Sequence, residues 1–163
     1  AWRGLMLDVS RHWFTKEEVK KYIDELAECK MNVFHWHLTD DQGWRLEIKS
    51  LPRLTEVGAW RAPRVGQWWQ RAPQQPGEET TYGGFYTQED VKEVLAYAAE
   101  RYVRVIPEID VPGHSLAALV AYPDLACMKA PSAVGGRQQV LRRRRKHTLC
   151  RQRMPLSSLW TRS

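Results

Sequence analysis

Three short apolar stretches, each running into polar residues, constrain the fold of this chain more than any other feature. They span residues 4–9, 32–38 and 103–109 and have the length and hydrophobicity of buried parallel strands. Thr15 and Thr87 have the positions of helix N-caps, and acidic residues follow each of them in the first helical turn. The alternation of strand, helix and strand predicts βαβ units and therefore an α/β sheet or barrel.

Two amphipathic helices are expected between the strands. Their predicted buried faces are Val19, Tyr22, Ile23, Leu26 and Ala27 in the first helix, and Val91, Val94, Leu95 and Ala98 in the second. A short helix is expected at residues 115–122. Residues 41–84, rich in Pro, Gly, Trp and Gln, are expected to be irregular, with residues 64–84 forming a long surface loop.

Polar residues gather where each expected strand ends, at residues 8–12, 35–41 and 108–114. In α/β barrels the carboxyl ends of the strands form the rim at which active sites are built. The sequence therefore predicts a functional site assembled from these three clusters.

Two clusters contribute charged candidates. The planar fork of Arg11 suits vicinal hydroxyls or a carboxylate, and an ion pair with Asp8 or Asp40 is an equally good interpretation. Neighbouring residues on an extended segment point in opposite directions. One of Asp40 and Asp41 is therefore expected to face the site, while the other caps a helix or pairs with Arg45.

The third cluster contributes Glu108, Asp110 and His114. Glu108 and Asp110 share one side of their strand, and the Pro-Gly turn presents His114. We favour His114 as a site residue. The alternative for Glu108 and Asp110 is a structural pairing with Arg or His inside the barrel.

His35 and His37 could form a metal-binding pair, because alternate strand residues share a face. Asp40, Asp110 or His114 would complete such a site, giving a metal-dependent hydrolase barrel. The acidic pair and the Gly-Trp-Arg turn that follow favour a hydrogen-bonded polar rim instead. We therefore expect no metal and no other cofactor.

Length and charge divide the chain into two parts. Its 163 residues are fewer than the roughly 250 of a complete (β/α)₈ barrel, so a truncated barrel with about the first three strands is expected.

The net charge is +6, but residues 137–163 hold nine basic residues and no acid, which leaves −3 for residues 1–136. Residues 135–163 could bind nucleic acid. We prefer to interpret them as disordered or as non-native, from a shifted reading frame, after a domain at residues 1–134. We expect neither a nucleic-acid nor a membrane partner, since no stretch approaches the roughly 20 apolar residues of a membrane span.

Four motifs resemble glycoside hydrolase family 20, the β-N-acetylhexosaminidases. They are RGLMLDVSRH at residues 3–12, NVFHWHLTDDQGWR at 32–45, GFYTQEDV at 84–91 and IPEIDVPGH at 106–114. The resemblance covers roughly residues 2–134. It implies a (β/α)₈ barrel that removes terminal, non-reducing N-acetylhexosamine residues from glycans with retention, the substrate's own acetamido oxygen acting as nucleophile. Relatives are often exported, periplasmic or lysosomal, which leaves the location of this chain open, as is its oligomeric state.

The resemblance also implies roles for individual residues. Asp40 and His114 would belong to the catalytic network around the acid. Arg11 would hold sugar hydroxyls, and His37 and Glu108 would complete the substrate-binding rim.

One departure from the family pattern concerns the catalytic acid. The family's Asp-Glu pair follows the fourth strand, whereas no Asp-Glu step follows His114 here, and Asp124 is the last acidic residue. The only such dipeptide is Asp24-Glu25, within the first expected helix. Because a glycosidic oxygen leaves only when an acid protonates it, we expect this polypeptide to be inactive. With half a barrel we also expect it to fold poorly alone.

Overall fold

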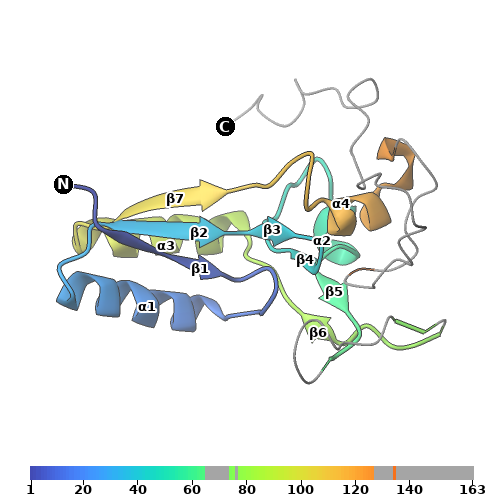
Figure 1. Ribbon diagram of the computed structural model, residues 1–163, viewed down its shortest axis with the longest axis horizontal. Helices are drawn as coiled ribbons and strands as arrows, with labels where there is room; N and C mark the ends of the chain where they lie inside the picture. The colour runs from blue at the N-terminus through green and yellow to red at the C-terminus, as the bar shows by residue number, and fades with distance from the viewer. Residues whose placement is uncertain (65–73, 76, 127–133, 135–163) are drawn as a thin grey trace.

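A parallel sheet of three strands forms the centre of the computed structural model, which describes residues 1–64, 74–75, 77–126 and 134 (Figure 1). The strands are β1 (Gly4–Asp8), β2 (Val33–His37) and β7 (Arg104–Glu108), in the order β1-β2-β7. All three run in one direction, so their carboxyl ends meet at the same edge. The three predicted strands are thus confirmed, each to within one or two residues.

Two helices pack on one face of this sheet. They are α1 (Lys16–Glu28) and α3 (Gln88–Glu100), and each begins with a capping box, built by Thr15 and Glu18 in α1 and by Thr87 and Asp90 in α3. The cap satisfies N–H groups that the first helical turn leaves unpaired. Both predicted helix starts are confirmed.

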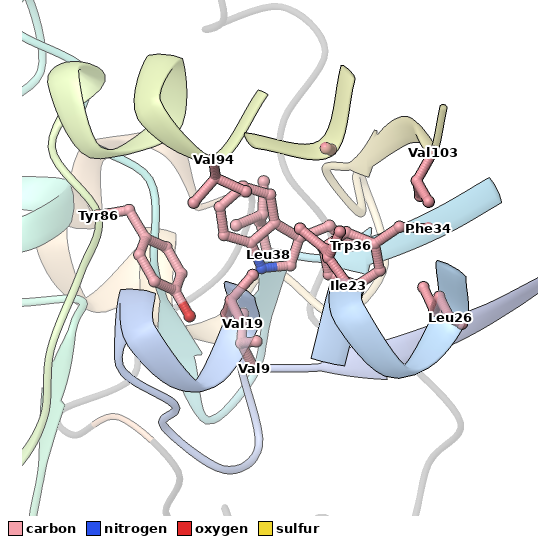
Figure 2. Close-up of a cluster of buried hydrophobic side chains, with 11 residues drawn as sticks. Val9, Val19, Ile23, Leu26, Phe34, Trp36, Leu38, Tyr86, Val94 and Val103 are labelled. Carbon is pink, nitrogen blue, oxygen red and sulfur yellow. The ribbon is translucent and has the colours of Figure 1, made fainter. Parts of the chain in front are cut away.

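The hydrophobic core lies between the sheet and these helices, as Figure 2 shows. Phe34 and Trp36 of β2 are fully buried there against both helices. The buried residues of the helices are Val19, Ile23 and Leu26 in α1 and Val94 and Ala98 in α3. Leu95 is 44% exposed, so its predicted burial is wrong. Leu95 is not among the residues of α3 that pack into the core.

The opposite face of the sheet carries alternating residues in registered rows. Met6, His35 and Ile106 form one row, and Asp8, His37 and Glu108 form the row nearest the carboxyl ends. Met6 of β1 is 50% exposed on this face. In the described part of the chain this face is therefore incompletely covered.

The segment after β2 contains short elements that the sequence did not predict. They are β3 (Thr39–Asp40), β4 (Gly43–Trp44), α2 (Arg53–Glu56), β5 (Trp60–Arg61) and β6 (Tyr82–Gly83), with β3 paired to β4 and β5 to β6. The expectation of an irregular segment at 41–84 is therefore wrong for β4, α2, β5 and β6, and β3 lies just before that segment. Strands of two residues are too short to show a periodicity in the sequence. Of the expected surface loop, residues 65–73 and 76 lie outside the described residues.

A second, smaller core covers the carboxyl end of the sheet. The predicted short helix is present as α4 (Leu116–Ala121), followed by the 3₁₀ helix η2 (Pro123–Leu125). Ala117 and Ala121 of α4 pack with Trp44 and Leu54. The described helices include none long and apolar enough to span a membrane. Residues 135–163, to which the sequence assigns a basic tail, lie outside the described part.

Candidate active site

Asp40, the last residue of β3, is the centre of the polar cluster at the carboxyl ends of the strands. Its side chain is 1% exposed. Its Oδ2 lies 2.7 Å from Nη2 of Arg11 and 2.9 Å from Nε2 of His37, and its Oδ1 lies 3.2 Å from Nδ1 of His114. Burial alone would raise the pKa of Asp40, but the hydrogen bonds from His37 and from the Asp41 N–H, with the charge of Arg11, lower it overall. The carboxylate is therefore ionised and fully surrounded by donors.

Arg11 reaches Asp40 from the turn that follows β1. Asp8 accepts hydrogen bonds from the backbone N–H groups of Ser10 and Arg11, at 3.1 and 2.9 Å, which shapes this turn. The Arg11 guanidinium then bridges Asp8 (2.5 Å) and Asp40 (2.7 Å). Burial would lower the pKa of Arg11, but the two carboxylates raise it overall. The predicted ion pairs are present, and 46% of the side chain stays exposed to a ligand.

His37 and Glu108 extend the network along the sheet. Nδ1 of His37 lies 2.8 Å from Oε2 of Glu108, and Nε2 of His35 lies 2.6 Å from the same oxygen. The hydrogen bond to Asp40, with help from Glu108, outweighs burial and raises the pKa of His37 to about 9. At neutral pH His37 is therefore a buried imidazolium between two carboxylates. Close polar contacts thus connect His35, Glu108, His37 and Asp40.

His114, in the loop that follows β7, is the last member of the cluster. Its backbone adopts the left-handed conformation, with φ of 51°, and its side chain is 53% exposed. The neighbouring Asp41 accepts a hydrogen bond from the backbone N–H of Leu116 at 3.1 Å, near the start of α4. Asp40 thus faces the cluster while Asp41 holds the adjacent helix, as the alternation of side chains predicts. Asp110 contributes its backbone N–H, which donates to Thr39 Oγ1 at 2.9 Å.

Among the described residues, the donor groups that could hold a metal ion include two considered in the sequence, Asp40 and His114, with Asp41 in place of His35 and His37. Asp40, Asp41 and His114 each offer one atom, all within 4.8 Å of one another. His35 and His37 instead direct ring nitrogens at carboxylates of the network. A cation at Asp40 would compete with two positive charges already in place, Arg11 and His37.

Sequence reasoning missed the role of Arg45, which is wholly buried. We expected it to pair with Asp40 or Asp41, and that expectation is wrong. Its guanidinium donates to backbone carbonyls, among them those of Val9 and Ser10, at 3.0 and 2.8 Å. The nearby glycines of the GWR and GGFY motifs were the available signal, because glycines mark close approaches of backbone to another group.

We expect stability to depend on pH through His37. Its folded pKa of about 9 exceeds the unfolded value of about 6.5, so its full stabilisation, about 3 kcal/mol, is present below pH 6.5 and is lost as pH rises through 9. Urea unfolding at pH 6, 8 and 10 measures this loss. His37→Gln is the control, since it should remove most of the slope. Equal stability of the unsubstituted chain at pH 6 and 10 would contradict the expectation.

The chain is similar to known proteins in sequence and in fold. The model of the catalytic domain of glycosyl hydrolase family 20 matches residues 1–156. A β-hexosaminidase of Porphyromonas gingivalis is 53% identical over 127 residues, 78% of this chain and 15% of that relative. One of Vibrio furnissii is 57% identical over 123 residues, 76% of this chain and 20% of that relative.

Solved structures give the same picture. A mutant β-hexosaminidase of Streptomyces plicatus, in complex with its product GlcNAc, matches with a TM-score of 0.71 and 43% identity, covering 92% of this chain and 26% of that one. An exo-β-N-acetylglucosaminidase of Vibrio harveyi, in complex with N-acetylglucosamine, matches with a TM-score of 0.71 and 42% identity, covering 97% and 23%. The chain thus spans about a quarter or less of the length of these relatives.

Proposed function

The chain belongs to glycosyl hydrolase family 20, a family of glycosidases, and from this premise we propose that it carries the sugar-binding side of a β-N-acetylhexosaminidase active site. One observation carries the proposal. Arg11 and His114, from the ends of different strands, both contact the buried carboxylate of Asp40. Hydrogen-bond donors with exposed surface therefore converge on one point of the rim.

The fold proposed for this site is the first part of a (β/α)₈ barrel. Three parallel strands in consecutive order, with a helix after β1 and another before β7, are the arrangement that such a barrel repeats. The alternating rows on the face away from the helices would then point into the barrel. The sheet in the described residues is open, so closure requires strands beyond these three.

The proposed substrates are glycans that end in a non-reducing N-acetylhexosamine. The Arg11 fork has five N–H donors and would bind hydroxyls of the terminal sugar with those that Asp8 and Asp40 leave free. His114, half exposed, would contact the substrate beside Asp40. His37, whose positive charge Glu108 supports, would keep Asp40 ionised and in place. In the proposed retaining mechanism the acetamido oxygen of the sugar attacks the anomeric carbon, so no protein nucleophile is needed.

The proton for the leaving oxygen has no evident source in this polypeptide. The Asp-Glu pair expected from the family pattern does not follow His114, and Asp124 is the one acidic residue after it. A positioned general acid typically raises the rate of such a reaction by about 10²–10⁴-fold. We therefore propose that the 163-residue chain binds the sugar without hydrolysing it.

The division into a domain at residues 1–134 and a non-native or disordered segment at 135–163 remains a proposal. The family match extends to residue 156, across this boundary. The nucleotide sequence around codons 134–140 tests the division. A shifted frame should encode a strand that ends in Asp-Glu.

Hydrolysis of p-nitrophenyl β-N-acetylglucosaminide tests the proposal directly. We expect no p-nitrophenol above background, together with binding of N-acetylglucosamine, observed by NMR, that Arg11→Lys abolishes. Arg101→Lys is the matched control, because Arg101 pairs with Asp24 on the helix side of the sheet. Arg11-dependent hydrolysis would refute the proposed inactivity, and sugar binding unaffected by Arg11→Lys would refute the site.

A metal-dependent hydrolase is the second candidate, favoured by the three ligand atoms of Asp40, Asp41 and His114 within 4.8 Å. Elemental analysis of the purified protein, before and after dialysis against zinc, separates the two functions. Stoichiometric zinc that Asp41→Asn removes would support the metal site.

A further inference from the structure

Arg45 joins three segments of the chain from a wholly buried position. Its guanidinium donates to the carbonyls of Val9 (3.0 Å), Ser10 (2.8 Å) and Gly84 (3.1 Å), and also to that of Ala59. Burial lowers the pKa of Arg45 to about 10, which still leaves it charged at neutral pH. A buried guanidinium satisfied by carbonyl dipoles is a strong and directional link between backbones.

The surrounding backbone is shaped to admit this side chain. A Cβ atom on Gly43 would lie 2.4 Å from Cζ of Arg45, so only glycine leaves room there. A Cβ on Gly84 would lie 2.3 Å from the ring of Trp13, and that ring lies 5.7 Å from the Arg45 guanidinium. The glycines in the GWR and GGFY motifs therefore form part of a built cradle.

The cradle acts on the turn that carries Arg11. Val9 and Ser10, whose carbonyls Arg45 holds, directly precede Arg11. From the other side, Arg61 donates from Nη2 to the carbonyl of Arg11 at 3.0 Å. Two arginines thus bind the backbone of this turn, and the side chain of Arg11 is left to Asp8 and Asp40.

We propose that Arg45 is a positioning residue, which holds the backbone of residues 9–11 so that the Arg11 guanidinium stays beside Asp40. Its relevance to sugar binding rests on the proposed function. Lysine cannot replace it, since one ammonium cannot span carbonyls from three segments. Methionine fills a similar volume but leaves these buried carbonyls without a donor.

The titration of His37 reports the position of Arg11 independently of any sugar. Nη2 of Arg11 and Nε2 of His37 share the same oxygen of Asp40, at 2.7 and 2.9 Å. Removal of this neighbouring positive charge raises the pKa of His37. Histidine-labelled NMR on the full chain should show this rise in Arg11→Ala.

The decisive experiment compares Arg45→Met, Arg11→Ala and the double variant. We expect Arg45→Met to raise the pKa of His37 as much as Arg11→Ala does. The double variant should show no further rise, because two residues that act through one contact are not additive. Arg101→Met, whose partner Asp24 lies on α1, should leave the His37 titration unchanged. A folded Arg45→Met with the unsubstituted titration, or additive shifts, would overturn the proposal.

Two further measurements keep the test decisive. If Arg45→Met does not fold, Gly43→Ala displaces the guanidinium while retaining it, and the same rise in the pKa of His37 is expected; an unchanged titration overturns the proposal. The affinity for N-acetylglucosamine should fall about tenfold or more in the same variants, because one charge-assisted hydrogen bond to the sugar is lost. If the unsubstituted chain binds no sugar, the proposed function fails, while the titration still decides the role of Arg45.

Discussion

Replacement of Asp40 by alanine should lower the free energy of unfolding by about 3–5 kcal/mol, the cost of removing one partner from a buried ion pair. The side chain is 1% exposed and contacts Arg11, His37 and His114. Without it, His37 remains buried with the pairing to Glu108 alone. Native domains are stable by about 5–15 kcal/mol, so the variant should lose a large part of its stability and unfold at a lower urea concentration. Circular dichroism with urea titration at pH 7 measures the change.

Asp40→Asn and Glu89→Ala are the matched controls for this variant. Asparagine keeps the shape and one acceptor oxygen, so we expect an intermediate loss. Glu89 is 73% exposed and pairs with Lys92 on the surface of α3, where a substitution should change stability by no more than about 0.5 kcal/mol. An Asp40→Ala protein as stable as Glu89→Ala would mean that the network contributes nothing to folding.

Replacement of Trp36 by alanine should have a similar effect through packing alone, about 3–5 kcal/mol. Trp36 is 1% exposed, and its ring centroid lies 5.7 Å from that of Phe34 and 4.7 Å from that of Tyr86. Its removal opens a cavity at the middle of the core shown in Figure 2. Thermal unfolding followed by far-ultraviolet circular dichroism measures the loss.

Trp2→Ala provides the control for tryptophan removal, because Trp2 is 70% exposed. It should change stability by no more than about 0.5 kcal/mol. Equal effects of the two substitutions would show that the β2 core does not form in solution.

Local signals explain why the principal elements could be predicted. Thr15 and Thr87 define the helix starts, because each side chain bonds to a backbone N–H three residues ahead. The three strands stand out as apolar runs between these helices. Their shared direction then brings Arg11, Asp40 and His114 to one edge, so the gathering of these side chains follows from topology. The family, in contrast, was predicted from motif resemblance.

The features that escaped prediction depend on contacts between distant residues. Arg45 binds the carbonyl of Gly84, 39 residues along the chain, and that of Val9, 36 residues back. Asp40 or Asp41 was the expected partner of Arg45 because a sequence shows which side chains are charged but not which backbone carbonyls lie nearby. For the same reason the β3–β4 and β5–β6 pairs could not be predicted from two-residue strands.

The partly bare face of the β1–β2–β7 sheet has a practical consequence for work in solution. Met6, 50% exposed on this face, lies on β1, one of the two edge strands, whose outer side pairs with no described strand. An unpaired strand edge can pair with the same edge of another molecule. We therefore expect the folded protein to aggregate as its concentration rises. Light scattering against concentration would follow it, and a charge at Met6 should keep the protein dispersed.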